Sequence, residues 1–316
     1  MALTRDIHEG TCTSSFHGHR ARRPWPFAAA VLVPVVALLL LGACSPVPNS
    51  LAAEDQAPQA VPLLSAPWVK AVPLPYRWEG YNEQLRDACV GPTHFRFPAN
   101  MFRDQVGPDF QGNFTLVLMW PDLQPAAPGK LNGQPMEQVM ARVRIIPYHV
   151  DRVPIETVLE RSTRPIPGTE SPQDPTRSLA LRDRQPARFG LTPFYVNPQR
   201  FADFHADQSR RFGNKSRAKI EDTQDWYLYH DNTGRLTTLI RCDSHLEPDG
   251  YAIQGRQLVK IPNDPTNAQC THRFVMKDIK ADISISYPRA LLSEWMKFET
   301  RARALFTENR IRSPKP

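Results

Sequence analysis

The side chains best suited to acid–base chemistry in this sequence are its histidines. Six of them lie in the part of the chain that is expected to fold: His94, His149, His205, His230, His245 and His272. The motifs that would organise them into a catalytic site are missing. There is no HExxH zinc-protease motif, no GxSxG nucleophile elbow, and no phosphate-loop or dinucleotide fingerprint. The sequence therefore predicts no cofactor and favours a protein that is not an enzyme.

The densest polar group is the stretch "RCDSHLEPDG", which holds Asp243, His245, Glu247 and Asp249. Their oxygen atoms could bind a divalent cation. A polar loop that follows a strand has the same composition, and we favour that interpretation. No metal site is predicted here. A zinc site built from cysteines is not expected either, because no CxxC spacing occurs.

A second charged stretch, "NMFRDQVGPDFQG", places Arg103, Asp104 and Asp109 beside an apolar run. One interpretation is an arginine–aspartate pair that fixes a turn. The other is a pair of carboxylates that binds a ligand or acts as acid and base. We favour the structural role. If the protein were a hydrolase, His94, Asp104 and His245 would be the residues to test.

Cys44 is the residue whose chemistry the sequence specifies best. It follows an apolar run over residues 27–43, which itself follows Arg20, Arg22 and Arg23. A basic start, an apolar stretch and small closing residues are typical of a secretory signal. The run is 17 residues long, and a membrane span needs about 20. An uncleaved anchor helix is the alternative.

The ending "LGAC" at residues 41–44 resembles the lipobox of bacterial lipoproteins. The resemblance implies that residues 1–43 are removed as a signal peptide and that the thiol of Cys44 carries the lipid. It also implies that the chain is attached to a membrane by this N-terminal lipid. Because Ser45 rather than an aspartate follows the cysteine, the sorting rule of these lipoproteins implies the outer membrane, facing the periplasm.

Export would place the other cysteines in an oxidising compartment. With Cys12 removed and Cys44 lipidated, Cys89, Cys242 and Cys270 remain. Cys242 and Cys270 each lie at the end of a predicted strand, so we expect them to form a disulfide. Cys89 would then be left over, or it would belong to the true pair instead.

The charge of the chain argues against a nucleic-acid partner. The formal net charge is +7, and basic residues alternate with acidic ones in stretches such as "RSLALRDRQPAR". A nucleic-acid-binding protein would show a basic stripe interleaved with aromatic residues. We expect instead a solvated surface that tolerates anionic lipid or an acidic partner.

The composition divides the chain into three parts. Residues 1–43 are the signal segment, and residues 44–75 are rich in proline and alanine, as a semi-extended tether would be. Residues 76–316 are expected to form a single globular domain. A polar, proline-bearing stretch near 160–190 predicts a long surface loop, and loops of this length are usually functional or disordered.

The domain is predicted to be α+β. Its expected strands lie within residues 94–102, 112–121, 140–150, 225–242 (a hairpin), 269–277 and 281–288. The apolar run 114–120 predicts a central strand. After Pro288, apolar residues recur every three or four positions and predict a helix docked on an antiparallel sheet: Leu291, Leu292, Trp295, Phe298, Ala302, Leu305 and Phe306. Elsewhere, helix is expected only for a few residues near 201–209.

Four stretches together resemble a group of proteobacterial envelope lipoproteins: "FRFPANMFRDQVGPDFQG", "LVLMWPDL", "CTHRFVM" and "ISISYPRALLSEWMKFETRARALF". The resemblance spans much of residues 76–310. Some members are encoded beside type VI secretion effectors, including lipases, which implies an immunity role. That role would require a protein partner, and its inhibition would need no catalytic residue.

Three functions follow as hypotheses. The first is a lipoprotein that binds and neutralises a secreted toxin, with the loop 160–190 and the turn Asp231–Gly234 as candidate contact surfaces. The second is a structural or accessory lipoprotein of an envelope or secretion assembly. The third is a periplasmic hydrolase, for which the sequence offers only the three residues named above.

Overall fold

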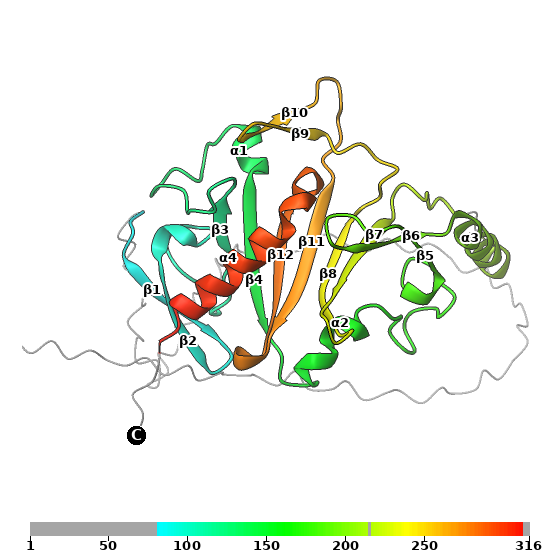
Figure 1. Cartoon of the computed structure of the whole chain (residues 1–316), viewed down its shortest axis with the longest axis horizontal. Helices are drawn as coiled ribbons and strands as arrows, with labels where there is room; N and C mark the ends of the chain where they lie inside the picture. Colours follow the sequence, from blue (N-terminus) through cyan, green and yellow to red (C-terminus); the bar gives the residue numbers. More distant parts are fainter. Residues whose placement is uncertain (1–80, 214–215, 312–316) are drawn as a thin grey trace, which may run out of the picture. The chain divides into compact units, whose positions relative to one another are not determined.

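The structure is a computed structural model that describes residues 81–213 and 216–311. An eight-stranded antiparallel sheet with the order β3–β4–β12–β11–β8–β7–β6–β5 runs through this part of the chain (Figure 1). Its strands are β3 (Leu116–Met119), β4 (Arg142–His149), β5 (Arg182–Arg184), β6 (Thr192–Val196), β7 (Gln224–His230), β8 (Leu236–Asp243), β11 (Gln269–Met276) and β12 (Ala281–Pro288). With the C-terminal helix α4 on one face, this confirms the predicted fold class.

Two hairpins and several helices complete the fold. The hairpins are β1 (Leu85–Val90) with β2 (Thr93–Pro98), and β9 (Tyr251–Gln254) with β10 (Gln257–Lys260). The α-helices are α1 (Met136–Met140), α2 (Val158–Arg161), α3 (Pro198–Phe212) and α4 (Trp295–Glu308), and the short 3-10 turns are η1 (Ala99–Met101), η2 (Ile155–Thr157), η3 (Leu179–Leu181), η4 (Lys277–Ile279) and η5 (Arg289–Glu294). Among the described residues, no helix is both long and apolar enough to span a membrane.

The main core lies between α4 and the strands β4, β12, β11 and β8. The helix contributes Trp295, Phe298, Ala302, Leu305 and Phe306, all of which are buried as the sequence periodicity predicts. The strands contribute every second residue, so that β11 alternates buried and half-buried positions along its whole length. The first turns after Pro288 are 3-10 rather than α-helical.

The opposite face of the sheet is covered in part by α2. Leu159 of α2 packs with Trp226, Leu228 and Leu239 in a smaller core. The guanidinium of Arg182 lies 4.0 Å from the ring centroid of Trp226, and that of Arg241 lies 4.4 Å from it. This stacking joins the edge strand β5 to the middle of the sheet.

The position of β3 corrects one prediction. The apolar run 114–120 predicted a central strand, but β3 lies at an edge of the sheet and pairs only with β4 among the eight strands. It is buried because other segments cover it: Leu116 forms an isolated bridge with Phe102, and Val117 packs with Leu131 on the other face. An apolar run predicts that both faces of a strand are buried. It does not show whether the strand lies at the centre of the sheet or at an edge that irregular segments cover.

The disulfide prediction is confirmed. Cys242 of β8 and Cys270 of β11 face each other directly in the sheet, with a Cα–Cα distance of 4.0 Å, and are bonded. The alternative in which Cys89 belongs to this pair is therefore excluded. Cys44, with the predicted signal peptide (1–43) and tether (44–75), lies outside the described residues.

The stretch 160–190 is irregular for most of its length, as predicted, but it also holds η3 and the edge strand β5. The helix that follows it is longer than expected, since α3 has 15 residues. Its ends carry the usual signals: the Asn197 side chain accepts a hydrogen bond from the backbone of Arg200, Pro198 is the first residue, and Gly213 ends the helix with φ 68°. The prediction was too short because α3 buries only Phe201, so it lacks an apolar stripe.

Candidate functional site

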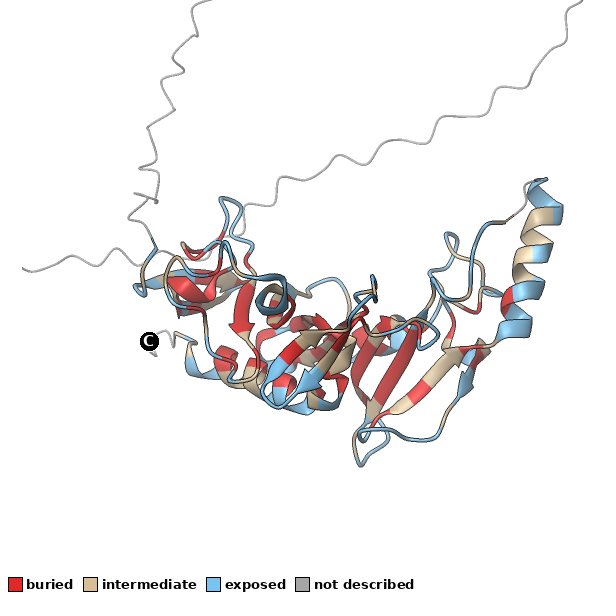
Figure 2. Ribbon diagram, turned by 90° about the horizontal axis from the view of Figure 1, so that it is seen from above, coloured by how far each residue is buried: buried red, intermediate tan, exposed pale blue. Residues whose placement is uncertain are grey.

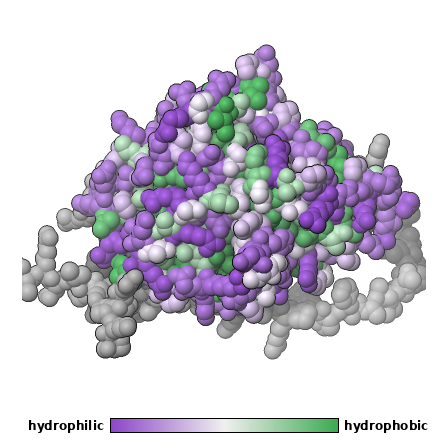
Figure 3. Space-filling view, in the orientation of Figure 1, coloured by the Kyte–Doolittle hydropathy of each residue, from purple (hydrophilic) through white to green (hydrophobic). Residues whose placement is uncertain are grey.

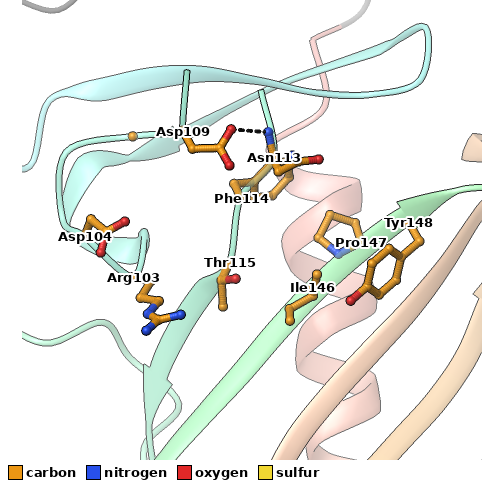
Figure 4. Close-up of a pocket in the computed structure, with 10 residues that line it drawn as sticks. Arg103, Asp104, Asp109, Asn113, Phe114, Thr115, Ile146, Pro147 and Tyr148 are labelled. Atoms are coloured by element: carbon orange, nitrogen blue, oxygen red, sulfur yellow. Dashed lines mark hydrogen bonds between the residues drawn. The ribbon is translucent and has the colours of Figure 1, made fainter. Parts of the chain in front are cut away.

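The charged stretch around Arg103 forms one wall of a groove beside β4 (Figure 4). The other wall consists of Ile146, Pro147 and Tyr148, and the groove encloses about 300 Å³. The backbone NH of Arg103 donates to the carbonyl oxygen of Thr115 at 2.8 Å. This bond closes the loop at its base and fixes the charged wall against the sheet.

Asp109 holds the loop in shape. Its carboxylate accepts hydrogen bonds from the backbone NH groups of Gln111 (2.8 Å) and Asn113 (2.9 Å), and Figure 4 shows the second of these. Aspartates that bond to backbone NH groups a few residues onward are typical of tight turns. The structural role that we favoured is therefore correct for Asp109.

Arg103 and Asp104 do not form the predicted turn-fixing pair. Both side chains are exposed, and no ion pair within 4 Å involves either of them among the described residues. The turn is fixed by the carboxylate and backbone of Asp109 instead. Asp104 thus remains the single unengaged carboxylate of the groove, and no histidine lines it. The lining thus offers one free charge of each sign, Arg103 and Asp104, for binding.

Three arginines lie close together at this edge of the sheet. Burial lowers the pKa of Arg142, and the charges of Arg144 and Arg103 lower it further. The guanidinium of Arg142 is held by the side-chain oxygen of Gln134 at 2.9 and 3.0 Å. Arg103 and Arg144 are both exposed. Of these three arginines, Arg103 lines the groove together with the free carboxylate of Asp104.

Two exposed aromatic residues adjoin the groove. Phe110 lies at the tip of the loop and is 91% exposed, and Tyr148 lines the wall formed by β4 and is 52% exposed. Aromatic and arginine side chains supply most of the binding free energy in protein interfaces. The sequence analysis missed both residues. Phe110 could have been found, because an aromatic residue in a polar, glycine-bearing turn has no neighbours to bury it.

The structure separates the three residues proposed for a hydrolase. Asp104 lines the groove, His94 lines a different cavity of about 850 Å³, and His245 lines a third of about 180 Å³. His94 lies 3.5 Å from a carboxylate oxygen of Asp87. These residues therefore cannot act on one substrate.

His245 has a buried partner that the sequence did not reveal. Its Nδ1 lies 2.9 Å from the carboxylate of Asp225, which also accepts the backbone NH of His245 at 2.6 Å. Its ring stacks on Tyr195 with centroids 3.9 Å apart. Burial raises the pKa of Asp225, although the bonds from His245 oppose the rise. This arrangement anchors the segment after β8 to β7.

Two further acidic residues of "RCDSHLEPDG", Asp243 and Asp249, hold the same segment in place. Arg289 forms an ion pair with Asp249 at 2.6 Å and donates to the carbonyl oxygens of Asp243 and Ser244. The carboxylate of Asp243 accepts the backbone NH of Gln269 at 2.8 Å. Within residues 81–213 and 216–311, no group of three or more potential metal ligands occurs. The contacts of Asp243 and Asp249 are those of carboxylates that hold a polar segment in place.

The two predicted contact surfaces differ in availability. At the turn Asp231–Gly234, the Asp231 carboxylate bonds to the backbone and hydroxyl of Thr233 and to the backbone of Arg235. The bond from the Thr233 hydroxyl is the main cause that lowers the pKa of Asp231 to about 2. This turn satisfies its own polar groups. The stretch 160–190, by contrast, is largely exposed.

The chain was compared with known protein families, curated sequences and solved structures. Neither a protein-family model nor a curated protein sequence matches the chain. A solved structure does: Smlt3025, an immunity protein of the Stenotrophomonas maltophilia type IV secretion system. It is 31% identical in sequence, and the match covers 73% of this chain and 95% of that one with a TM-score of 0.66. The similarity thus extends over nearly the whole of the solved protein.

Proposed function

We propose that this chain, which belongs to the same family as the immunity protein Smlt3025, protects the cell that makes it by binding and neutralising a secreted protein toxin. The observation that carries the proposal is this similarity across 95% of the solved immunity protein. The geometry of the candidate site is consistent with this proposal. The groove beside β4 offers exposed aromatic anchors and unpaired charges, and the residues that a hydrolase would need are kept apart.

We further propose that the toxin contacts the groove. Phe110 and Tyr148 would be its anchors, because an exposed aromatic side chain gains buried area on binding at a small cost in conformational entropy. Arg103 and Asp104 would then select the orientation of the partner through one charge of each sign. Occlusion of the toxin's own active site would suffice for neutralisation.

The toxin is proposed to come from a type IV secretion system, by analogy with Smlt3025. The sequence resemblance described above implies a type VI effector instead, so the genetic identity of the captured toxin decides between the two. Lipid attachment through Cys44 and an outer-membrane position also belong to the proposal. Cys44→Ala should release the chain from membranes that have been washed with carbonate, and retention there would exclude the lipid anchor.

Affinity capture tests the proposal directly. The full-length chain with a C-terminal tag is extracted in detergent and exposed to an envelope extract and to the purified products of neighbouring genes, and bound proteins are identified by mass spectrometry. We expect one dominant partner that kills cells when it is expressed alone in the periplasm and is harmless when the chain is co-expressed. A spread of envelope components without a toxic partner would replace the proposal with the accessory-lipoprotein function.

A further inference from the structure

The net charge of the chain originates in a single segment. Residues 161–219 hold 12 of the 39 lysines and arginines but only 5 of the 32 acidic residues, which gives this segment a net charge of +7. The whole chain also has a net charge of +7. The remaining residues therefore hold 27 basic and 27 acidic side chains and are neutral on balance.

This charge lies on the surface. Of the eleven cationic side chains described in residues 161–213 and 216–219, ten are exposed, and Arg182, stacked on Trp226, is the buried exception. The acidic side chains of the segment are engaged locally: Asp207 pairs with Arg210 and Arg211, and Asp183 accepts a hydrogen bond from Asn197. The local acidic residues thus leave most of the positive charge uncompensated.

Several of these cations have no acidic partner in the described part of the chain. Arg184 on the edge strand β5, Arg200 on α3 and Arg217 after α3 are exposed, and no carboxylate among the described residues lies within 4 Å of them. Structural ion pairing therefore does not explain their presence. An exposed cation without a partner is free to meet a charge on another molecule.

The segment forms one end of the sheet. It supplies β5, β6 and α3, which follow β7 at the end of the strand order opposite to β3 (Figure 1). Seen from above, α3 is exposed along most of its length (Figure 2). In the space-filling view, hydrophilic side chains cover this end of the molecule (Figure 3). Phe212 at the end of α3 is also 70% exposed. We name the described part of this end, residues 161–213 and 216–219, the basic end.

The exposed side chains of the basic end are of kinds that bind proteins. Ten of its eleven described cationic residues are arginines. The planar guanidinium of arginine matches a carboxylate with two parallel hydrogen bonds, and arginine and aromatic residues are enriched at protein interfaces. The basic end also exposes the aromatic side chain of Phe212. An acidic protein surface therefore fits these side chains.

We propose that the basic end is an interaction surface for an acidic face of the toxin, and that it accelerates the encounter between the two proteins. This inference rests on the proposed function, since it describes the same partner. Complementary charge acts mainly on the association rate, by about 10- to 1000-fold, and its effect falls as salt rises. The groove would slow dissociation, whereas the basic end would speed association.

Charge reversal at the basic end tests the inference. The variant Arg184→Glu/Arg200→Glu/Arg217→Glu changes three exposed side chains that make no ion pair in the described structure. The matched control, Lys130→Glu/Arg152→Glu/Lys277→Glu, makes the same change in net charge at exposed positions outside the basic end. A second variant with glutamine at the first three positions removes the charge without reversing it. Thermal unfolding checks that all of them fold.

The measurement is the association rate of each full-length variant with the captured toxin, at low and at physiological salt. We expect the reversal to lower the rate by about 10- to 100-fold at low salt, the glutamine variant to lower it less, and the control to stay within about threefold. The salt dependence should flatten in the first two variants only. Equal rates for reversal and control would overturn the inference and leave the proposed function intact.

Two other outcomes would also decide the question. Vesicles of phosphatidylcholine and phosphatidylglycerol serve as the lipid probe: if the reversal abolishes vesicle binding but leaves the toxin association rate unchanged, the basic end serves a membrane and the inference is wrong. If capture yields no toxic partner at all, both the proposed function and this inference fail together.

Discussion

The two long helices of this protein, α3 and α4, have similar lengths and opposite relations to the sheet. α4 has 14 residues and buries six of them, including Glu299, whereas α3 has 15 residues and buries only Phe201. α4 lies over the strands of the main core, and α3 belongs to the basic end. The two helices carry the same formal net charge of +1, so they differ in how many side chains they bury and not in charge.

This contrast suggests that stability and recognition occupy different parts of one sheet. Burial of apolar area provides most of the free energy of folding, so substitutions under α4 should lower stability. Substitutions at the basic end and the groove should change binding while the fold stays intact.

The largest effect should come from the core beneath α4. Phe298 is 1% exposed and its ring lies 4.6 Å from that of Tyr287, so Phe298→Ala should lower the free energy of unfolding by about 3–5 kcal/mol. Phe212→Ala is the matched change at the end of α3, where the side chain is 70% exposed, and it should cost less than about 0.5 kcal/mol. Urea unfolding measures both, and similar losses would refute the contrast between the helices.

The disulfide should rank second. Cys242 and Cys270 are 28 residues apart in the sequence, and closing a loop of this length stabilises the native state by about 3–4 kcal/mol through the unfolded chain. The double variant Cys242→Ala/Cys270→Ala removes both thiols and leaves no reactive cysteine at this site. Its urea midpoint should fall accordingly, while toxin affinity at a temperature where it is folded should not change. A loss of affinity without a loss of stability would contradict the prediction.

The buried polar group under α4 should make stability depend on pH. Burial is the main cause that lowers the pKa of the His272 imidazole below 6.5, although Glu299 opposes the shift. Burial alone would raise the pKa of Glu299, but the hydrogen bond from His272 and the charge of Arg303 hold it below its usual value. Glu299 also accepts the Thr238 hydroxyl at 2.8 Å. Both groups therefore resist protonation in the folded state.

The sign of the effect follows from these shifts. Below pH 6.5 the unfolded chain binds a proton at His272 that the native state does not, so the free energy of unfolding falls as pH decreases. The slope reaches about 1.4 kcal/mol per pH unit for one proton. Below pH 4.5, Glu299 adds to the loss in the same way. His272→Gln should reduce the slope below about pH 6.5 in urea titrations, and an unchanged slope would contradict the prediction.

The sequence predicted the α4 side of the molecule well because its features are local and periodic. Local patterns predict which side of each element is buried. They are the apolar stripe from Leu291 to Phe306, the alternation in β11 and β12, and the cysteines on two facing strands. The same reasoning placed β3 wrongly. Its apolar run reports burial, and the loop segments that provide the burial have no period of their own.

The candidate site was predictable only in part. The charged stretch with Arg103 and Asp104 was identified from its composition, but its opposite wall comes from Tyr148, on a strand that begins 39 residues further along the chain than Arg103. The uneven distribution of charge was hidden for a different reason: basic and acidic residues alternate locally in 161–219, and only the sum over the segment is strongly positive. Neither the contact between the two walls of the groove nor the net charge of a long segment produces a short sequence motif.

The N-terminal cap of α3 provides a smaller and more local test. The Asn197 side chain accepts the backbone NH of Arg200 at 2.9 Å, and loss of such a cap costs about 1 kcal/mol. Because α3 buries one residue, Asn197→Ala should fray the helix rather than unfold the domain. Hydrogen exchange should speed up in the amides of α3 while protection in β11 and β12 is unchanged. Faster exchange throughout the sheet would mean that α3 supports the core.

The smallest effect on stability should accompany the largest effect on binding, at the groove. Tyr148→Ala and Phe110→Ala remove side chains that are 52% and 91% exposed, so each should change the free energy of unfolding by less than about 0.5 kcal/mol. If these residues anchor the toxin, each substitution should speed dissociation and cost about 2 kcal/mol or more of binding free energy, because truncated aromatic anchors behave in this way.

Met136→Ala, at a position 59% exposed outside the groove lining, is the matched control and should leave both the stability and the dissociation rate unchanged. Dissociation rates measured by surface plasmon resonance compare the three variants with the wild type. If the toxin dissociates from the aromatic variants at the wild-type rate, Tyr148 and Phe110 are not its anchors. The basic end would then be the region in which to search for them.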